Sequence, residues 1–450
     1  MSRIGRTRQI LSALSVNLLA FSMGASIASP SYYTKFLGSE ESDLETGPLS
    51  PKETELIISL YNMGGIVGAV LFAYISRVIG RKMILKMVSA LHFIAYILIA
   101  YAYSGVMIMA SQFVLGIAAS GITITIPLFV CEIAEDNNRG ALGLMFSLLK
   151  SFGVVFSLSL GSVLNYYYVV WMFMLFPALY LFSTQFWYES AFYKIRSEGA
   201  CKAKNSLMFY RGVKSADTNS VQVEFDSLQQ FIKFYDGTDR DIKIFDFLTK
   251  AVRKSIIIGV VLVAMEQFSG YSFIIVKAGT IFQHAETISP EIAAIFAEFF
   301  QIFGILISII FVDSVGRKIM ISLSSIGVAI GILIYGLSEY FMMTKNLSII
   351  GLSITIFCYG IGMVSLPYVV ISEICPFNIR GTIIALCVTF SWVFRVVLVK
   401  LHALFLEAFG SDTISYYFII NCILGACFVI SYVPETKKKS LLEISHIMQR

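Results

Sequence analysis

The sequence predicts an all-α membrane protein with twelve transmembrane helices in two pseudo-symmetric six-helix bundles. Three observations support this fold class: a composition suited to lipid, twelve apolar runs of membrane-spanning length, and two pairs of repeated motifs. Of the 450 residues, 57% are hydrophobic and 14% are charged, which leaves too little polar surface for a water-soluble globule. The formal net charge of +5 has no basic cluster with interleaved aromatic residues, so we expect no nucleic-acid partner.

The first six apolar runs each approach the roughly 20 residues that cross about 30 Å of hydrocarbon. They cover residues 10–28, 56–76, 84–103, 107–130, 141–164 and 169–187. The run at 10–28 follows three arginines, as the core of a signal peptide would. Because it lacks a clean small-residue cleavage site, we interpret it as the first span. These runs predict an amino-terminal six-helix bundle over residues 1–187.

Six further runs cover residues 255–280, 291–312, 319–341, 347–371, 382–406 and 414–432. They predict a carboxy-terminal six-helix bundle with a short cytoplasmic tail over residues 254–450. The segment between the two halves, 188–253, is rich in charged residues, and its apolar residues have helical spacing. We interpret it as a cytoplasmic linker with short amphipathic helices. Solvation is the simpler account of its charges, and a binding role is the alternative.

The loops predict the orientation of the chain in the membrane. If the amino terminus is inside, the basic residues at 77–86, 188–254, 317–318 and 437–439 all fall on the inner side. The outer side has only Lys35, Lys52 and Lys345. This positive-inside bias predicts a multi-pass protein with both termini in the cytoplasm, which we place in the plasma membrane. The glycosylation sequon at Asn346 falls in an outer loop.

The two halves carry the same motifs at the same places. EIAEDNNRG at 132–140 follows the fourth span, and EICPFNIRG at 373–381 follows the tenth. IGRK at 79–82 follows the second span, and VGRK at 315–318 follows the eighth. Two motif pairs in one order, at one membrane face, indicate an internal repeat.

The charged residues of these motifs predict a latch at the cytoplasmic face, because ion pairs between halves can form in one state and break in another. The predicted latch residues are Arg81, Glu132, Arg139, Asp313, Arg317, Glu373 and Arg380. Anchoring of the topology by positive charge is an alternative that is compatible with a latch.

The chain resembles the sugar porters of the major facilitator superfamily. The resemblance rests on PLFVCEIAEDNNRG at 127–140, EQFSGYSF at 266–273, VDSVGRK at 312–318, PYVVISEICPFNIRG at 367–381, SW at 391–392 and PETKKKSLLEI at 434–444. SVNLLAFSMG at 15–24 and Lys400 are most similar to insect facilitated trehalose and hexose transporters. The resemblance implies two bundles that rock about a binding site at the bilayer midplane.

A sugar needs hydrogen-bond donors and acceptors for its hydroxyls and an aromatic face for its C–H side. The resemblance implies that Gln267, Ser272, Gln301 and Trp392 do this work. Each of them could instead hold helices together, as polar residues between spans do.

Several positions depart from the family pattern. Glu266 and Ser272 stand where the family has Gln and Asn, and Ser147, Ser391 and Tyr368 replace Gln, Asn and Trp. We include Ser147 and Tyr368 in the predicted site. Fewer amides face the hydroxyls, and such a change alters specificity, so glucose is doubtful as the substrate.

Ionisable residues occur at membrane depth, where each charge costs several kcal/mol. Glu266 lies about 18 Å along its span from Lys254, near the midplane, and Arg395 lies at comparable depth, so the two are a candidate pair. Other ionisable groups at membrane depth are Lys150, Glu298 and, near the outer mouth, Lys277. These groups could form a fixed internal staple, contact a substrate more polar than a hexose, or include Glu266 as a proton carrier.

We predict a facilitative carrier of trehalose or a hexose, because Met23 stands where the family's coupling carboxylate would be. The alternatives are a proton-coupled sugar or polyol symporter and a nutrient sensor that does not transport. The sequence has no metal-ligand cluster, nucleophile elbow or phosphate-binding loop, so we expect no enzyme and no cofactor. The expected partners are a small-molecule sugar and the lipid bilayer, and we expect the monomer to be the functional unit.

Overall fold

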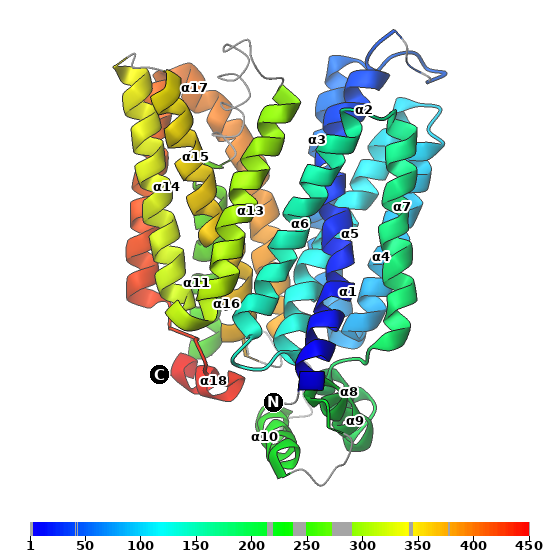
Figure 1. The fold of residues 1–450 in the computed structure, drawn as a ribbon, viewed down its shortest axis with the longest axis vertical. Coiled ribbons are helices and arrows are strands. Elements are labelled where there is room, and N and C mark those ends of the chain that lie inside the picture. Colours follow the sequence, from blue (N-terminus) through cyan, green and yellow to red (C-terminus); the bar gives the residue numbers. More distant parts are fainter. Residues whose placement is uncertain are drawn as a thin grey trace.

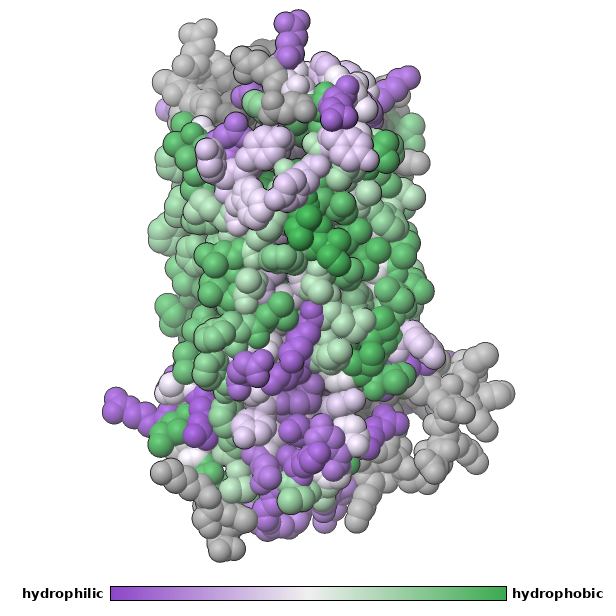
Figure 2. Space-filling view, turned by 90° about the vertical axis from the view of Figure 1, so that its right-hand side faces the viewer, coloured by the Kyte–Doolittle hydropathy of each residue, from purple (hydrophilic) through white to green (hydrophobic). Residues whose placement is uncertain are grey.

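The structure is a computed structural model of the chain, and it describes residues 3–40, 42, 44–213, 219–236, 249–271, 290–341, 345–376 and 379–449. The regular structure of these residues is entirely helical. Two helical bundles lie side by side, and both chain ends lie at the same end of the molecule (Figure 1). Eleven helical segments within the described ranges are long and apolar enough to cross a membrane. Between the polar ends the surface is a broad apolar band (Figure 2), as a bilayer requires.

The first bundle contains six long helices in the order predicted from the sequence. They are α1 (Arg3–Ala28), α3 (Pro51–Val78), α4 (Arg81–Ala100), α5 (Gly105–Ile133), α6 (Arg139–Gly161) and α7 (Tyr166–Ser183), with the short α2 (Pro30–Leu37) after α1. Glycines let the helices approach closely. A Cβ at Gly24 of α1 would lie 1.9 Å from the backbone oxygen of Lys150 in α6, and one at Gly153 would lie 2.0 Å from that of Phe21. Small residues at such crossings are typical of helices packed in lipid.

The second bundle contains α11 (Lys250–Gln267), α13 (Pro290–Val315), α14 (Arg317–Tyr340), α15 (Lys345–Ile361), α16 (Leu366–Ile374) and α17 (Arg380–Tyr432). The predicted seventh span, 255–280, begins within α11, and its last part, 272–280, lies outside the described residues. The predicted tenth span, 347–371, is divided into α15 and α16 at residues 362–365. Pro367 at the start of α16 accounts for a new helix there, because proline suits the first turn of a helix and not its interior.

The 53 residues of α17 hold both of the last two predicted spans. A straight helix of this length would extend about 80 Å, far more than a bilayer requires. Instead the chain rises in orange and returns in red (Figure 1). The segments 380–398 and 415–432 each have the length and apolarity of a span.

Short helices lie at the end of the molecule that holds the termini: η1 (Thr184–Phe186), α8 (Ala191–Ser197), α9 (Ala200–Arg211), α10 (Asn219–Asp236) and α18 (Leu441–Gln449). Residues of α8, α9 and α10 form a small apolar core of their own, and Leu442 of α18 packs against it. The segment between the bundles is therefore packed, and it contacts the carboxy-terminal end of the chain.

Candidate functional site

A small polar cavity lies between the two bundles, and both contribute to its walls. The lining residues that the structure describes are Met23, Ile27, Thr123, Phe146, Lys150, Glu266, Tyr368, Val388, Ser391, Trp392 and Arg395. They come from α1, α5 and α6 of the first bundle and from α11, α16 and α17 of the second. The cavity volume is about 30 Å³, enough for one or two water molecules. A sugar fits only if the surrounding side chains or the bundles move.

One wall of the cavity is a hydrogen-bonded network at the end of α11. The Gln267 side-chain nitrogen donates to Ser391 Oγ at 3.1 Å, and the Tyr368 hydroxyl lies 3.1 Å from the same oxygen. Arg395 Nε lies 3.4 Å from the Gln267 oxygen. The helix ends at Gln267, and in the turn that follows Gly270 has a φ of +82°, a left-handed conformation that favours glycine. Three of the predicted site residues thus meet here: Gln267 and Tyr368 share Ser391, and Arg395 bonds to the Gln267 oxygen.

Glu266 and Arg395 line the same cavity and interact electrostatically, but no ion pair joins these two described residues. Instead, the Arg395 guanidinium lies over the Trp392 ring, 4.8 Å from its centroid. Glu266 is 5% exposed, and its Oε2 has no hydrogen-bond partner among the described groups. Lys150 is the second cation that acts on it. The side chain of Glu266 therefore has an acceptor that a ligand could use.

A second polar cluster joins the bundles beside this cavity. Gln301 of α13 donates to Ser151 Oγ of α6 at 2.6 Å and to Glu298 Oε2 at 3.4 Å. The Tyr271 hydroxyl donates to Glu298 Oε1 at 3.3 Å. Lys150 interacts electrostatically with both Glu266 and Glu298, so the acids and bases at this depth lie within one electrostatic neighbourhood. This pairing of acidic and basic side chains is consistent with a fixed internal charge network as well as with a polar binding site.

The remaining predicted substrate residues are placed as follows. Trp392 lies against the first bundle, with its ring 5.7 Å from that of Tyr61. A Cβ at Gly65 would lie 2.4 Å from the Trp392 ring, so this contact requires glycine. Ser147 is buried and does not line the cavity. Ser272 and Lys277 lie outside the described residues.

The end of the molecule that holds the termini is closed by contacts between the bundles. The Asp313 carboxylate accepts hydrogen bonds from the backbone nitrogens of Gly140, at 3.2 Å, and Ala141, at 3.0 Å. These amides open α6, where a helix favours a negative charge. Arg139 Nη1 also reaches the backbone oxygen of Lys439 at 3.3 Å.

The other predicted latch residues bond within their own bundle. Arg81 pairs with Glu132 at 2.7 Å, and Arg317 pairs with Glu373 at 3.1 Å. Buried Arg380 donates from Nε to the backbone oxygen of Cys375 at 3.2 Å. Asp313 also pairs with Arg317, at 3.0 Å. The predicted latch therefore divides into two matching intrabundle pairs and a contact across the bundles.

Two acids that the sequence analysis did not single out complete these clusters. Glu189 accepts from the backbone nitrogen of Lys82 at 2.8 Å, and Glu435 accepts from those of Arg317 and Lys318 at 3.1 and 3.2 Å. Each acid caps the helix that begins with a Gly-Arg-Lys motif. Burial raises the pKa of the Glu189 carboxyl, although hydrogen bonds from the Ser190 and Lys82 backbones oppose the shift. A shared sequence pattern could have identified both acids, because Glu-Ser at 189–190 and Glu-Thr at 435–436 each follow the last span of a half.

The repeat is not perfectly symmetric at this cluster. The Ser190 hydroxyl donates to Glu132, but in the second bundle the matching Thr436 hydroxyl has no partner among the described groups.

Asn346 is exposed in the first turn of α15, as a glycosylated side chain must be. Within the described ranges, no group of three His, Cys, Asp or Glu side chains could hold a metal ion.

Comparison with known proteins identifies a family for nearly the whole chain. The model of the family "Sugar (and other) transporter" matches residues 11–448. The facilitated trehalose transporter Tret1 of Polypedilum vanderplanki is 23% identical over 98% of this chain and 88% of the relative. Tret1 of Bombyx mori is 27% identical over 85% and 75%, and the sugar transporter ERD6-like 6 of Arabidopsis thaliana is 24% identical over 98% and 89%.

Solved structures share the architecture. The major facilitator superfamily proton:xylose symporter XylE, bound to 6-bromo-6-deoxy-D-glucose, has a TM-score of 0.86 at 19% identity, over 99% of this chain and 100% of that chain. The inward-open conformation of XylE from E. coli has a TM-score of 0.68 at 18% identity, over 97% and 99%. The predicted fold class, an all-helical membrane protein with the two-bundle major facilitator fold, is therefore confirmed, and eleven of the twelve predicted spans meet the length and apolarity of a membrane span within the described residues.

Proposed function

This chain belongs to the sugar (and other) transporter family, and we propose that it carries trehalose or a hexose across the membrane by alternating access, without coupling to protons. The observation that carries this proposal is the polar cavity walled by both bundles. A site shared by two bodies opens to one side or the other when the bodies rock against each other. The cavity is too small for a sugar in the present arrangement, so binding and movement of the bundles are linked.

The chemistry of the cavity supports a polyhydroxylated substrate. Gln267, Tyr368 and Ser391 offer both donors and acceptors, and Trp392 offers an aromatic face. Gln301 of the neighbouring cluster offers an amide whose oxygen has no partner among the described groups. Glu266 has one such oxygen too, and we propose that it accepts a hydrogen bond from a substrate hydroxyl.

The absence of proton coupling is proposed from α1. Met23 lines the cavity at the position where the resemblance to sugar porters places a coupling carboxylate. Symport remains the second candidate, because buried Glu266 lies in the same cavity and could carry a proton. Two cations, Lys150 and Arg395, interact with Glu266 in this cavity.

We further propose that the end with both termini faces the cytoplasm and that the chain works as a monomer in the plasma membrane. The basic loops at 77–86 and 437–439 support this orientation. In this orientation the interbundle contacts of Asp313 and Arg139 close the cytoplasmic exit. The predicted latch residues would then have to separate before a substrate leaves on that side.

Counterflow into proteoliposomes tests the proposal. Purified chain is reconstituted, and exchange is measured for labelled trehalose, glucose, a polyol and a hexuronate. We expect exchange of trehalose or a hexose that equilibrates without accumulation, and Glu266→Gln should change the KM of that substrate at least about fivefold, which corresponds to about 1 kcal/mol. Glu198→Gln is the matched control, since Glu198 lies outside the membrane-spanning segments and pairs with Lys202.

The outcomes separate the candidate functions. Accumulation of a sugar under an imposed proton gradient would overturn uncoupled transport, and loss of that accumulation in Glu266→Gln would establish symport. Saturable sugar binding without exchange would favour a nutrient sensor. If Glu266→Gln left every substrate unchanged, Glu266 would not belong to the site.

A further inference from the structure

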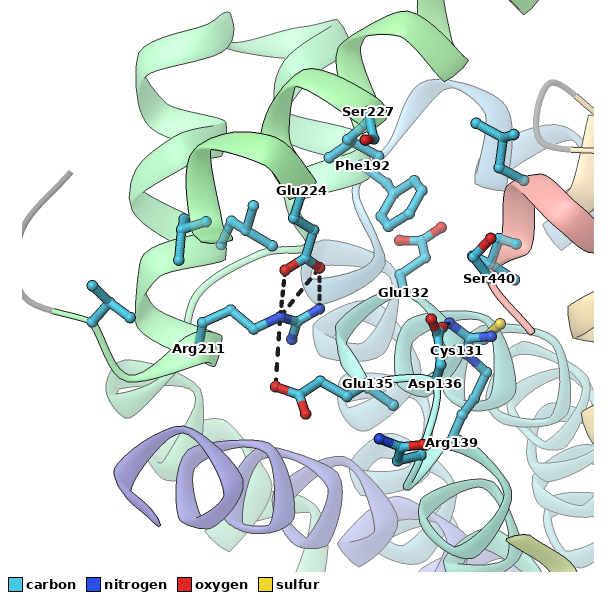
Figure 3. A pocket seen from close by; sticks show the side chains of 18 residues that line it. Cys131, Glu132, Glu135, Asp136, Arg139, Phe192, Arg211, Glu224, Ser227 and Ser440 are labelled. Carbon is cyan, nitrogen blue, oxygen red and sulfur yellow. Dashed lines mark hydrogen bonds and ion pairs between the residues drawn. The ribbon is translucent and has the colours of Figure 1, made fainter. Parts of the chain in front are cut away.

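A second and larger cavity lies at the end of the molecule that holds the termini, away from the proposed transport path. Its volume is about 600 Å³, within the range typical of small-molecule sites. Three parts of the chain form its walls: the connection between α5 and α6, the helices α8–α10, and residues 440–442 at the start of α18 (Figure 3). First-bundle, linker and carboxy-terminal residues therefore meet around one space.

Much of the wall is apolar. Its apolar residues are Ala134, Phe192, Leu207, Val213, Val221, Leu228, Leu441 and Leu442. Figure 3 shows Phe192 on the same wall of the cavity as Glu132. A ligand with an apolar body would bury surface here, and a charged group at one end would reach the polar side.

The polar side of the cavity has an excess of negative charge. Four carboxylates line it, from Glu132, Glu135, Asp136 and Glu224, against two guanidiniums, from Arg139 and Arg211. Arg81, outside the lining, pairs with Glu132 at 2.7 Å. Among the described residues of this cluster, four acids thus face three bases.

The excess charge is located at Glu135. Arg211 binds both oxygens of Glu224, at 2.5 to 3.1 Å, and lies 3.8 Å from Glu135 (Figure 3). Arg139 pairs with Asp136 at 2.5 Å. Glu135 is therefore the lining acid with the weakest pairing, and its side chain is 22% exposed. A cation placed beside Glu135 would compete only with this 3.8 Å pair, the longest ion pair of the cluster.

We propose that this cavity is a binding site for a small amphiphilic monocation: a protonated amine attached to an apolar body of about the size of a phenylalkyl group. The amine pairs with Glu135, and the body packs against Phe192, Leu228 and Leu441. An anion is disfavoured by the acidic side, and a neutral ligand gains only the apolar contacts.

Occupancy of this site stabilises the closed arrangement of the bundles, an effect that rests on the proposed transport function. Leu441 and Ser440 lie next to Lys439, whose backbone oxygen binds Arg139 of the first bundle. If this end opens, the carboxy-terminal wall separates from the α5–α6 connection. A ligand that touches both walls binds the closed state better, and this difference in affinity shifts the population and slows transport.

The binding test uses three probes with one apolar body: 4-phenylbutylamine, 4-phenylbutanol and 4-phenylbutanoate. Binding to the purified full-length chain in detergent is measured by calorimetry. We expect saturable binding of the amine, at least about fivefold weaker binding of the alcohol, and the weakest binding for the carboxylate. Glu135→Gln should remove the preference for the amine over the alcohol and leave alcohol binding unchanged, whereas Glu198→Gln should change neither.

The proposal is overturned if the amine does not bind saturably, if the three probes bind equally, or if Glu135→Gln keeps the preference for the amine. Phe192→Ala is a second variant at the apolar wall, and it should weaken the amine and the alcohol alike. In proteoliposomes, 4-phenylbutylamine should lower the maximal exchange rate without raising the KM for sugar. The same inhibition in Glu135→Gln would refute the stabilised closed state, whereas a chain that exchanges no sugar would refute the transport proposal and leave the binding result intact.

Discussion

Replacing Asp313 by Asn should loosen the closed end of the molecule. The Asp313 carboxylate accepts two backbone N–H bonds from the first turn of α6, across the interface between the bundles. Asparagine has nearly the same shape but no charge and only one acceptor oxygen. One interbundle bond is therefore lost, and the other becomes a bond between neutral groups.

The structure sets the size of the effect. Hydrogen bonds to charged groups contribute about 1.5–3 kcal/mol each, and a charge at a helix N-terminus contributes about 0.3–1 kcal/mol. The Asp313 side chain is 18% exposed, so solvent reduces these values only in part. Because one weaker bond remains, we expect the closed state to lose about 1.5–3 kcal/mol relative to the open state. That change raises the open-to-closed ratio by about 10- to 150-fold.

The assay is the reactivity of Cys131. This buried thiol lies between the bundles, with Sγ 3.5 Å from the backbone oxygen of Ser372. Cys131 also borders the large cavity at this end, but its sulfur is buried against Ser372 of the second bundle, so the labelling rate rises with the open population while that population is small. Mass spectrometry resolves the labelled peptides, and exposed Cys201, outside the membrane-spanning segments, provides an internal reference. Asp313→Asn should speed labelling of Cys131 in proportion to the open-to-closed ratio.

Glu435→Gln is the matched control. Glu435 also accepts two backbone N–H bonds at a helix start, but both come from its own bundle. We expect this variant to be less stable without faster labelling of Cys131. Equal acceleration in the two variants, or none in Asp313→Asn, would refute a latch across the bundles.

Three further predictions concern stability. Burial raises the folded-state pKa of Glu189 above its ordinary value of 4.5. The contribution of Glu189 to stability is therefore largest at low pH and falls as pH rises through the folded pKa. The difference in unfolding temperature between wild type and Glu189→Gln should decrease from about pH 4.5 to neutrality. Gly24→Ala should lower the unfolding temperature, since its Cβ would lie 1.9 Å from an α6 backbone oxygen and overpacking costs about 1–3 kcal/mol. Ser190→Ala should cost about 1–3 kcal/mol in the free energy of unfolding, measured with denaturant, because it leaves a buried carboxylate oxygen unpaired, whereas Thr436→Ala should cost less.

Each of these predictions has a contrary result. A difference for Glu189 that grows with pH would mean that hydrogen bonds, and not burial, dominate its titration. For Gly24, the comparison is Gly336→Ala, whose Cβ would meet its nearest atom at 3.3 Å; equal effects would remove close helix approach as the cause. If Thr436→Ala cost as much as Ser190→Ala, the two halves would be more symmetric at this cluster than the hydrogen bonds indicate.

The sequence by itself determined that this protein lies in lipid, where its membrane spans fall, and that its two halves are repeats. These properties depend on local composition: an apolar run of sufficient length must cross the bilayer as a helix, because its backbone polar groups find no partners in lipid. The repeated Gly-Arg-Lys and Glu-Ile motifs, the resemblance they carry, and residues such as Gln267 and Trp392 were also readable along the chain.

Only the tertiary structure decided which side chains meet. Depth along a span suggested that Glu266 pairs with Arg395, but rotation and packing of α11 and α17 instead place the guanidinium over Trp392. In the same way, Asp313 lies far along the chain from the α6 amides that it binds. Periodicity and motif spacing fix where a residue lies on its own helix, whereas contacts between helices also depend on how their surfaces fit, which is a property of both helices together.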